Sequence, residues 1–174
     1  SKVNNQGIAA SRGEIIVCLN NDVIVLTSDW LDRLVENTLR EDVGIVGSLL
    51  LYPDGTIQHA GVVIGLGGWA DHVYKGALPI HHGDPFVSPM VPRNVTAVTG
   101  ACMAFSRKLV DSIGGFDENF ILCGSDVEIC LRAIKRGYRN LYLPSVRLTH
   151  FESKTRASIS IPEVDFELSR EAYK

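Results

Sequence analysis

A short apolar run that ends in three polar residues constrains the fold most. Residues 14–19 read EIIVCL, and Asn20, Asn21 and Asp22 follow directly. A run of this length, rich in β-branched side chains, predicts a strand that is buried on both faces of a sheet. The polar residues would then lie at the carboxyl edge of that sheet, where open α/β sheets bind their ligands.

Strand-like and helix-like patterns alternate along the remaining sequence, which predicts an α/β fold with a sheet flanked by helices. The sheet is predicted to be mixed, because the turn Pro53-Asp54-Gly55 joins two strand-like runs into a hairpin. The 174 residues suffice for one domain with its own core. Helices are predicted at residues 2–11, 28–40 (with Ser28 as N-cap), 107–113, 125–136 and 162–173, and extended segments at 44–52, 57–63, 94–106, 138–143 and 146–150, with Pro144 separating the last two.

Charge and hydropathy exclude several classes of protein. With 17 basic and 20 acidic side chains the net charge is −3, so the chain has no basic excess for binding nucleic acid. No apolar run approaches the roughly 20 residues that span a bilayer. Cys18, Cys102, Cys123 and Cys130 form no CxxC pair, which favours buried free thiols over disulfides or a zinc site.

Asp22 is the first candidate for chemistry. A carboxylate at a sheet edge, next to Asn20 and Asn21, can hold a divalent cation, because hard cations prefer oxygen ligands. The same residue types also favour ordinary turns. The local pattern alone supports the turn more strongly than the cation site.

The second candidate is Ser125-Asp126-Val127-Glu128, at the start of a predicted helix. Asp126 can act as a general base there, because a carboxylate at a helix N-terminus is held rigidly against an incoming hydroxyl group. The structural alternative is a capping box from Ser125 to Glu128, with an ion pair between Glu128 and Arg132 one turn further on. Taken alone, these residues favour the structural alternative.

Histidines supply the remaining candidates. His150 ends the apolar run VRLTH, where a lone histidine is more often a structural residue than a ligand. Segment 65–93 has no sustained period, and an irregular stretch of this length inside a domain is typical of a functional or mobile loop. This segment contains five side chains that could ligate a metal, but an exposed loop is favoured over a metal site there. The five are Asp71, His72, His81, His82 and Asp84.

Motifs in a fixed order are more specific than any of these residues. Asn5, Gly7 and Ala9 come first, spaced N-x-G-x-A, and are followed by CLNNDV, VGSLLLYPDGTIQHAG, VTGACMAFSR, GGFDENF, GSDVEICLRAIKRGYRNLYLP and VRLTHFES. In this order they closely resemble the family 2 glycosyltransferases of the GT-A fold, especially the bacterial type that builds polysaccharide or cell-surface glycans. The resemblance covers residues 4–156 and implies a Rossmann-like mixed sheet flanked by helices.

The resemblance implies a metal and donor site around the first polar cluster. CLNNDV falls on the family's DxD-type motif, which makes Asp22 a metal ligand and places Asn20 and Asn21 with the donor substrate. His150 falls on the late histidine that completes the metal site. Small residues that let the backbone approach the donor sugar are expected at Thr99, Gly100 and Ala101.

The resemblance also implies a catalytic base. The family's acid-acid-x-acid motif falls on residues 125–128, so Asp126 is the expected base and Glu128 an expected substrate-binding residue. Two positions depart from the family pattern, because Asn20 and Ser125 stand where the family usually has acids. These departures leave open a non-catalytic GT-A-like module that binds carbohydrate or a protein partner.

The implied activity is inverting transfer of a sugar from a nucleotide-sugar donor to a hydroxyl acceptor, with Mg²⁺ or Mn²⁺ as cofactor. The expected acceptor is a saccharide or lipid-linked saccharide, which would place the protein in the cytoplasm or at the inner face of the membrane, in peripheral association through the acceptor. Segment 65–93 is the expected region of acceptor recognition. A metal-dependent hydrolase that uses His81, His82 and Asp84 is a weaker alternative.

The motif order predicts how the chain is organised. Residues 1–156 are expected to form the C-terminal portion of a GT-A domain, with its nucleotide-binding first strands upstream of Ser1, and residues 157–174 to form a helical extension. An exposed sheet edge in such a half-fold would allow a homodimer.

Overall fold

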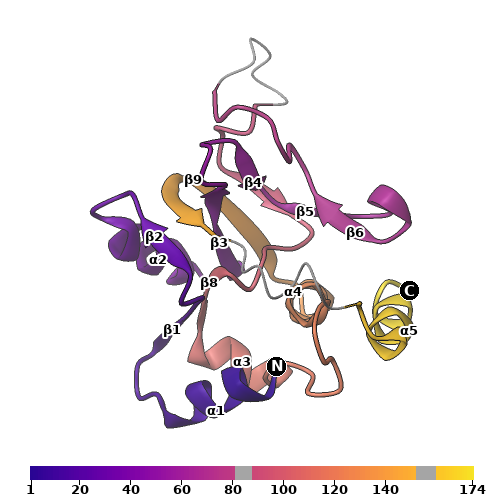
Figure 1. Ribbon diagram of the computed structural model, residues 1–174. Coiled ribbons are helices and arrows are strands. Elements are labelled where there is room, and N and C mark those ends of the chain that lie inside the picture. The colour runs from indigo at the N-terminus through magenta and orange to yellow at the C-terminus, as the bar shows by residue number, and fades with distance from the viewer. Residues whose placement is uncertain (81–87, 152–159) are drawn as a thin grey trace.

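A mixed sheet forms the centre of the computed structural model, which describes residues 1–80, 88–151 and 160–174 (Figure 1). Within these residues, seven strands form the sheet. Their order is β1 (Ile15–Leu19), β8 (Cys102–Ser106), β3 (Val43–Leu51), β9 (Arg139–His150) and β2 (Val23–Val25), with β4 (Ile57–His59) paired to β3 and β7 (Arg93–Val95) paired to β9.

Strand direction decides which residues share an edge of the sheet. β3 pairs in parallel with β9, while β8 is antiparallel to both β1 and β3. β1, β3 and β9 therefore run in the same direction, and their carboxyl ends lie at one edge. The amino end of β8 lies at that edge too. This arrangement confirms the predicted mixed sheet, including the hairpin between β3 and β4.

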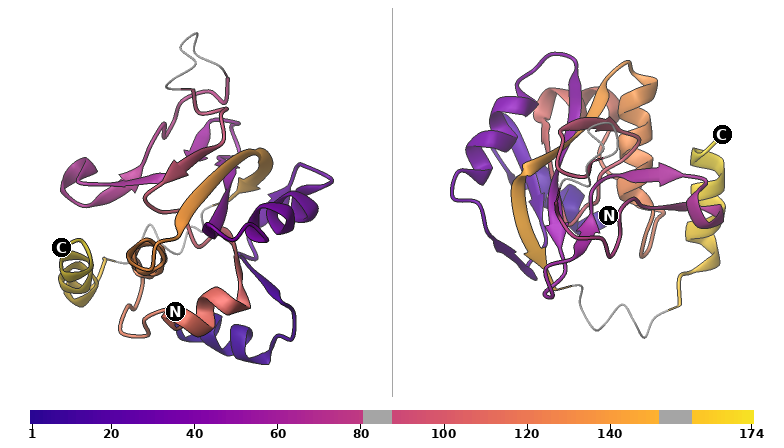
Figure 2. Two further views of the ribbon diagram at one scale, coloured as in Figure 1. Left: turned by 180° about the vertical axis from the view of Figure 1, so that it is seen from behind. Right: turned by 90° about the horizontal axis from the view of Figure 1, so that it is seen from above.

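Helices cover both faces of the sheet (Figure 2). On one face, Leu34 of α2 (Trp30–Thr38) packs into a core with Val46 and Ala104. On the other, Cys130 of α4 (Ser125–Lys135) packs into a core with Phe105, because successive side chains of a strand point to opposite faces. The second core also receives side chains from α1 (Lys2–Ala10) and α3 (Arg107–Ile113). α5 (Glu163–Ala172) lies on the outer side of α4.

The first strand differs from its prediction. We expected residues 14–19 to be buried on both faces, but only Ile16 of β1 is buried and Leu19 is 43% exposed. β1 lies at the end of the sheet order, with β8 as its partner on one side, and an edge strand is less covered than a central one. The fully buried strand is β3 instead.

Other boundaries also differ. Pro144 does not end a strand, because β9 continues through it where Ser48 and Leu49 of β3 face Leu143 and Arg147. This bulge lets the ring pass without a ladder hydrogen bond. The N-cap of α2 is Asp29 rather than Ser28.

Segment 65–93 is less irregular than expected, because it contains part of a small hairpin. The run predicted at 57–63 divides into β4 and β5 (Val62–Ile64), and β5 pairs with β6 (Ala70–His72). A short 3-10 helix, η1 (Leu66–Gly68), connects β5 to β6. This β5–β6 hairpin projects from the main sheet beside α5 (Figure 1).

The structure describes all four cysteines, and none of them forms a disulfide. Burial raises the pKa of the Cys18 thiol to about 11 and raises that of Cys102 as well, so both thiols are poor nucleophiles. Across the residues with described structure, no helix is long and apolar enough to cross a membrane.

Gly47 tests how tightly the core beside α4 is packed. A Cβ atom at this position would lie 2.5 Å from Cβ of the buried Val98. We expect Gly47→Ala to lower the free energy of unfolding by about 1–3 kcal/mol, since neither strand nor neighbour has room to move. The measurement is urea unfolding.

Gly7→Ala is the matched control, because Gly7 lies on the exposed face of α1 and a Cβ atom there has nothing within 4 Å. This variant is expected to keep or gain up to about 1 kcal/mol of stability. Equal unfolding midpoints for the two variants would contradict the packing described for Gly47.

Candidate active site

Chain segments from three parts of the sequence meet at the edge where β1 and β9 end. The Asn20 N–H donates to the Ala101 carbonyl over 3.0 Å, which extends the β1–β8 pairing by one step. The Phe151 N–H donates to the Asp22 carbonyl over 2.9 Å, next to the pair formed by Val23 and His150. Backbone pairing therefore holds the Asn20–Asp22 turn between the start of β8 and the end of β9.

The first side-chain cluster joins this turn to the end of β9. Asp22 Oδ1 lies 3.2 Å from His150 Nε2, and Asn20 Nδ2 lies 3.3 Å from the same nitrogen. The side chains of His150 and Asp22 are 11% and 25% exposed, so the cluster is mostly buried and one side of it reaches solvent. The two metal ligands implied by the sequence are thus brought together.

Gln58, on β4, completes this cluster and was not predicted. Its Oε1 lies 2.7 Å from His150 Nδ1, and its Nε2 donates to the His150 carbonyl over 3.5 Å. Because an amide oxygen only accepts, Nδ1 of His150 is the donor in this pair, and in the neutral ring Nε2 is then the unprotonated nitrogen that faces Asp22. The available signal was an amide within the hairpin motif TIQHAG, at a position that is 6% exposed.

Asp126 forms the second cluster, on the first turn of α4. Its Oδ2 accepts the Gly100 N–H over 2.9 Å, and its Oδ1 accepts the Val127 N–H over 2.9 Å. A Cβ atom at Gly100 would lie 3.5 Å from Cβ of Asp126, so the backbone before β8 approaches this side chain closely. Each oxygen of the Asp126 carboxylate is therefore held by one main-chain N–H group.

The predicted capping box does not form. The N-cap of α4 is Gly124, in a left-handed conformation with φ of 96°, so Ser125 is already helical and its side chain caps nothing. Both Glu128 oxygens accept hydrogen bonds from the Arg132 guanidinium, over 2.6 and 2.7 Å. The i,i+4 ion pair is confirmed, and the carboxylate that we expected to bind substrate is occupied within its own helix.

A cavity of about 200 Å³ unites most of the predicted site. Asp126 and His150 line it together, although they are placed by different elements. Asp22, Asn21 and Glu128 are not among its lining residues; Asp22 reaches the site through its contact with His150, and the assignment of Asn21 and Glu128 to the substrate stays a prediction. The lining residues are Ser1, Asn4, Asn20, Thr99, Gly100, Ala101, Phe116, Leu122, Cys123, Ser125, Asp126 and His150.

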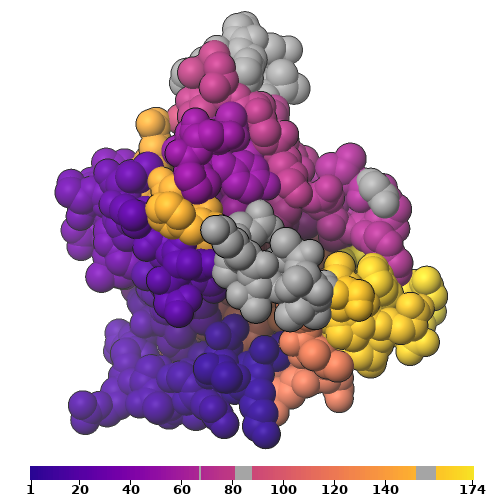
Figure 3. All heavy atoms as spheres, viewed as in Figure 1, coloured from indigo at the N-terminus to yellow at the C-terminus, as the bar shows by residue number. Residues whose placement is uncertain are grey.

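Asp126 also lines a second cavity, of about 340 Å³, so its carboxylate belongs to the wall between two spaces. The two cavities share Thr99, Cys123 and Asp126. The second cavity lies between the β5–β6 hairpin and α5, whose surfaces are adjacent in Figure 3. Its polar and aromatic lining includes Trp69, Asp71, His72, Lys75, Phe166 and Tyr173.

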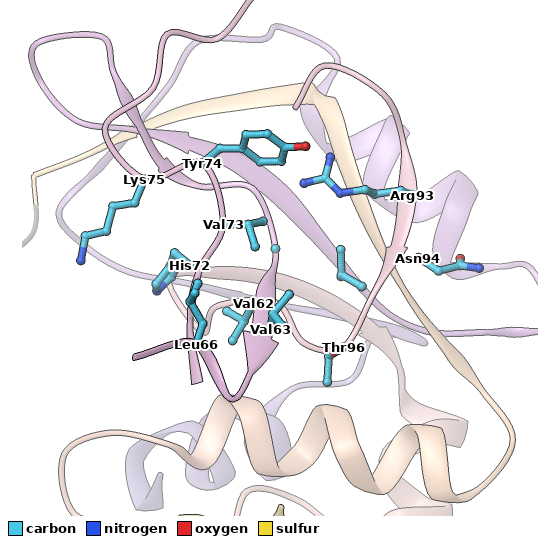
Figure 4. A pocket seen from close by; sticks show the side chains of 12 residues that line it. Val62, Val63, Leu66, His72, Val73, Tyr74, Lys75, Arg93, Asn94 and Thr96 are labelled. Atoms are coloured by element: carbon cyan, nitrogen blue, oxygen red, sulfur yellow. The ribbon is translucent and has the colours of Figure 1, made fainter. Parts of the chain in front are cut away.

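The largest of these cavities, about 590 Å³, is not part of the predicted site (Figure 4). It lies between the β5–β6 hairpin and β7, and Arg93 is at its rim with Tyr74. The Arg93 guanidinium carbon lies 5.2 Å from the centre of the Tyr74 ring and 4.6 Å from that of Tyr142. These contacts fasten β7 to the sheet and leave Arg93 engaged within the fold.

The loop histidines do not form a metal centre where the structure describes them. His81, His82 and Asp84 lie outside the described residues. His72 Nδ1 contacts Nδ1 of His59 over 2.8 Å, and burial holds the pKa of His59 well below its usual value. In the part of the chain that the structure describes, no group of three or more His, Cys, Asp or Glu side chains could hold a metal.

Comparison with known proteins shows where this fold and sequence recur. The chain is similar to the O-antigen biosynthesis protein RfbC of Myxococcus xanthus, with 43% identity over 172 residues, 99% of this chain and 14% of that protein. It is also similar to an N-acetylglucosaminyl-diphospho-decaprenol L-rhamnosyltransferase of Mycobacterium tuberculosis, with 26% identity over 135 residues, 71% of this chain and 42% of that enzyme. The chain thus spans less than half the length of either relative.

Solved structures share the fold at low sequence identity. A crystal structure of GalNAc-T7 with UDP, GalNAc and Mn²⁺ matches 86% of this chain and 30% of that one, with a TM-score of 0.65 and 17% identity. The mannosyltransferase PcManGT from Pyrobaculum calidifontis, in complex with GDP-Man and Mn²⁺, matches 97% of this chain and 46% of that one, with a TM-score of 0.56 and 16% identity. These matches confirm the GT-A fold that the motif order predicted.

The chain also matches a protein family as a whole. The family described as glycosyltransferase like family 2 matches residues 1–164 of the 174. That span includes the turn at Asp22, the helix that carries Asp126 and the strand that ends at His150. The chain belongs to the glycosyltransferase-like family 2.

Proposed function

We propose that this chain supplies the catalytic portion of an inverting glycosyltransferase, which moves a sugar from a nucleotide-sugar donor to a hydroxyl acceptor in polysaccharide or cell-surface glycan synthesis. Relatives named for O-antigen biosynthesis and rhamnosyl transfer support this reaction class. The observation that carries the proposal is the Asp126 carboxylate, held by two backbone N–H groups in the wall between two cavities.

Asp126 is proposed as the general base. Two main-chain donors stabilise the ionised carboxylate and fix its direction, which keeps its oxygens ready to accept the proton of an acceptor hydroxyl. Attack by that hydroxyl on the anomeric carbon, from the face opposite the leaving diphosphate, inverts the configuration in one step. A base placed in this way typically contributes about 10²–10⁴ in rate.

Asp22 and His150 fit a divalent cation. In the neutral ring with its proton on Nδ1, Nε2 of His150 and Oδ1 of Asp22 are two acceptors 3.2 Å apart, an arrangement that a positive charge between or beside them stabilises. A carboxylate oxygen and a neutral imidazole suit Mn²⁺ or Mg²⁺ with water and diphosphate oxygens as further ligands. Asn20 replaces one family acid, so these side chains carry one charge fewer. The cation would neutralise charge on the departing diphosphate.

The second cavity is proposed to receive the acceptor. Trp69 and Phe166 offer apolar ring surface, while Asp71 and Lys75 offer hydrogen-bonding groups, a combination that suits a saccharide. Burial raises the pKa of Tyr173, and the nearby Asp126 charge adds to this effect, so its phenol stays protonated as a donor. Acceptor recognition is therefore assigned to the part of segment 65–93 that lines this cavity, which includes Trp69, Asp71 and Lys75.

Asp126→Asn tests the proposed base. We expect transfer by the purified full-length protein to fall by about 10²–10⁴, because an amide cannot take up the proton. Binding of the nucleotide sugar should change little, since the amide has nearly the same size. The measurements are transfer rates across a panel of nucleotide sugars and donor binding by calorimetry.

Asp111→Asn serves as the matched control, because Asp111 is an exposed carboxylate on α3 and contacts neither cavity. It should retain the parent rate. Normal turnover by Asp126→Asn would reject the base. A full-length parent that binds saccharide but transfers no sugar would instead support the non-catalytic module.

Asp22→Asn tests the cation site with a readout that does not depend on turnover. We expect Mn²⁺ to bind at least about tenfold more weakly, because its only carboxylate ligand among these side chains is lost. Binding is followed by the loss of the electron paramagnetic resonance signal of free Mn²⁺. Asp32→Asn, on the exposed face of α2, is the control, and equal Mn²⁺ affinity of both variants would contradict the assignment.

Gln58→Leu tests the role of the amide behind His150. A leucine cannot accept the Nδ1 proton, so the ring should lose its fixed tautomer and Mn²⁺ affinity should fall about 10- to 100-fold. The tautomer is read from long-range ¹H–¹⁵N spectra in alkaline buffer, where the parent should show Nδ1–H. Gln58→Glu retains an acceptor and should keep that tautomer. A parent ring protonated on Nε2 would overturn the prediction.

A further inference from the structure

Asp165, on α5, is a buried carboxylate that the proposed reaction does not use. Its residue exposure is 1%. Oδ1 accepts the Ile121 N–H over 2.8 Å, and Oδ2 accepts the Leu122 and Cys123 N–H groups over 2.8 and 2.9 Å. Three consecutive backbone donors therefore converge on one side chain, which balances a buried negative charge with main-chain dipoles rather than with a cation.

These donors belong to the last part of the loop that leads into α4. The beginning of the same loop is held differently, because the Arg132 guanidinium of α4 donates to the carbonyls of Ile113 and Gly115. Arg132 thus binds carbonyl groups where the loop begins, and Asp165 binds N–H groups where it ends. The second anchor comes from α5, which is separated from β9 in sequence but lies beside the loop in Figures 2 and 3.

The contact between α5 and the loop continues to the N-cap of α4. A Cβ atom at Gly124 would lie 2.7 Å from Oγ of Ser169, one turn after Asp165 on the same helix. Ser169 itself is 5% exposed. The backbone immediately before α4 is therefore fixed against α5 without space for a side chain, and Asp126 follows two residues later.

We propose that Asp165 is a positioning residue for Asp126, acting through residues 121–124. This inference rests on the proposed role of Asp126 as the base. Asp126 Oδ2 reaches the Gly100 N–H over 2.9 Å only while the first turn of α4 keeps its place against β8. Release of residues 121–123 would leave three N–H groups without their buried acceptor, let that turn shift and weaken the Gly100 hydrogen bond. A displacement of about 1 Å at a reacting group can cost 10²-fold in rate.

Asp165→Asn in the full-length protein is the test. An amide keeps one acceptor oxygen, so it cannot satisfy the three N–H groups in the parent geometry. We expect kcat to fall about 10- to 100-fold. The Mn²⁺ affinity should stay unchanged, because Asp22, in the turn after β1, and His150, at the end of β9, are held by strand pairing rather than by residues 121–123. The KM for the nucleotide sugar should stay at the parent value, because the donor site keeps its own contacts. Amide hydrogen exchange at residues 121–123 should become faster.

Two further variants make the result decisive. Glu167→Gln removes an exposed charge from the same helix and should leave rate and amide exchange unchanged. Asp165→Glu keeps the charge and is the milder variant if the asparagine variant proves too unstable to assay; it should show a smaller change in the same direction. The number of Mn²⁺ sites per protein reports the folded fraction, and a fall in rate no larger than the fall in that number would overturn the positioning role.

The outcomes also separate this inference from the proposed function. If Asp126→Asn is inactive while Asp165→Asn turns over with the parent rate, Asp126 stays the base and the role of Asp165 is rejected. If Asp126→Asn itself turns over normally, the proposed function fails first, whatever Asp165→Asn does. Parent exchange rates at residues 121–123 in Asp165→Asn would show that the carboxylate does not hold the loop.

Discussion

The parallel pairing of β3 with β9 is the constraint on which the candidate site depends. It makes β9 run in the same direction as β1, so His150 ends at the edge where Asn20 and Asp22 begin their turn. Hydrogen bonds from Asn20 to Ala101 and from Phe151 to Asp22 then join the two ends. Asn20 and His150 are 130 residues apart in sequence, yet backbone pairing within the sheet brings them to one edge.

The elements of this fold were largely predictable, because period and turn chemistry act locally. Gly and Pro signals located the hairpin between β3 and β4, and apolar spacing located α3, α4 and α5. The errors arose where tertiary context decides. Burial of β1 depends on its place in the sheet, and the passage of β9 through Pro144 depends on a bulge opposite β3. The choice of Gly124 over Ser125 as N-cap depends on α5, which packs too closely for a side chain.

The candidate site was also predictable in part from the sequence. Asp22, Asp126 and His150 came from motif order, and the structure joins Asp22 to His150 and lets Asp126 share a cavity with His150. Gln58 and Asp165 were not found, since neither stands in a pattern that announces chemistry. Each acts by accepting N–H groups from distant segments, and such partners are specified only by the folded chain. Glu128 pairs with Arg132 within its own helix, and its expected contact with the substrate stays a prediction.

The shared wall at Asp126 separates two kinds of surface. The space beside His150 is built from the ends of sheet strands, whose residues also form the core, so substitution there disturbs folding as well as chemistry. The other space is built from α5 and from a hairpin whose strands pair with each other outside the main sheet. Asp165 and Ser169 of α5 are fixed by the loop that they hold, but Trp69 and Lys75 lie outside the buried cores and can be exchanged without disturbing them. The proposed acceptor surface can therefore change while the proposed base stays in place.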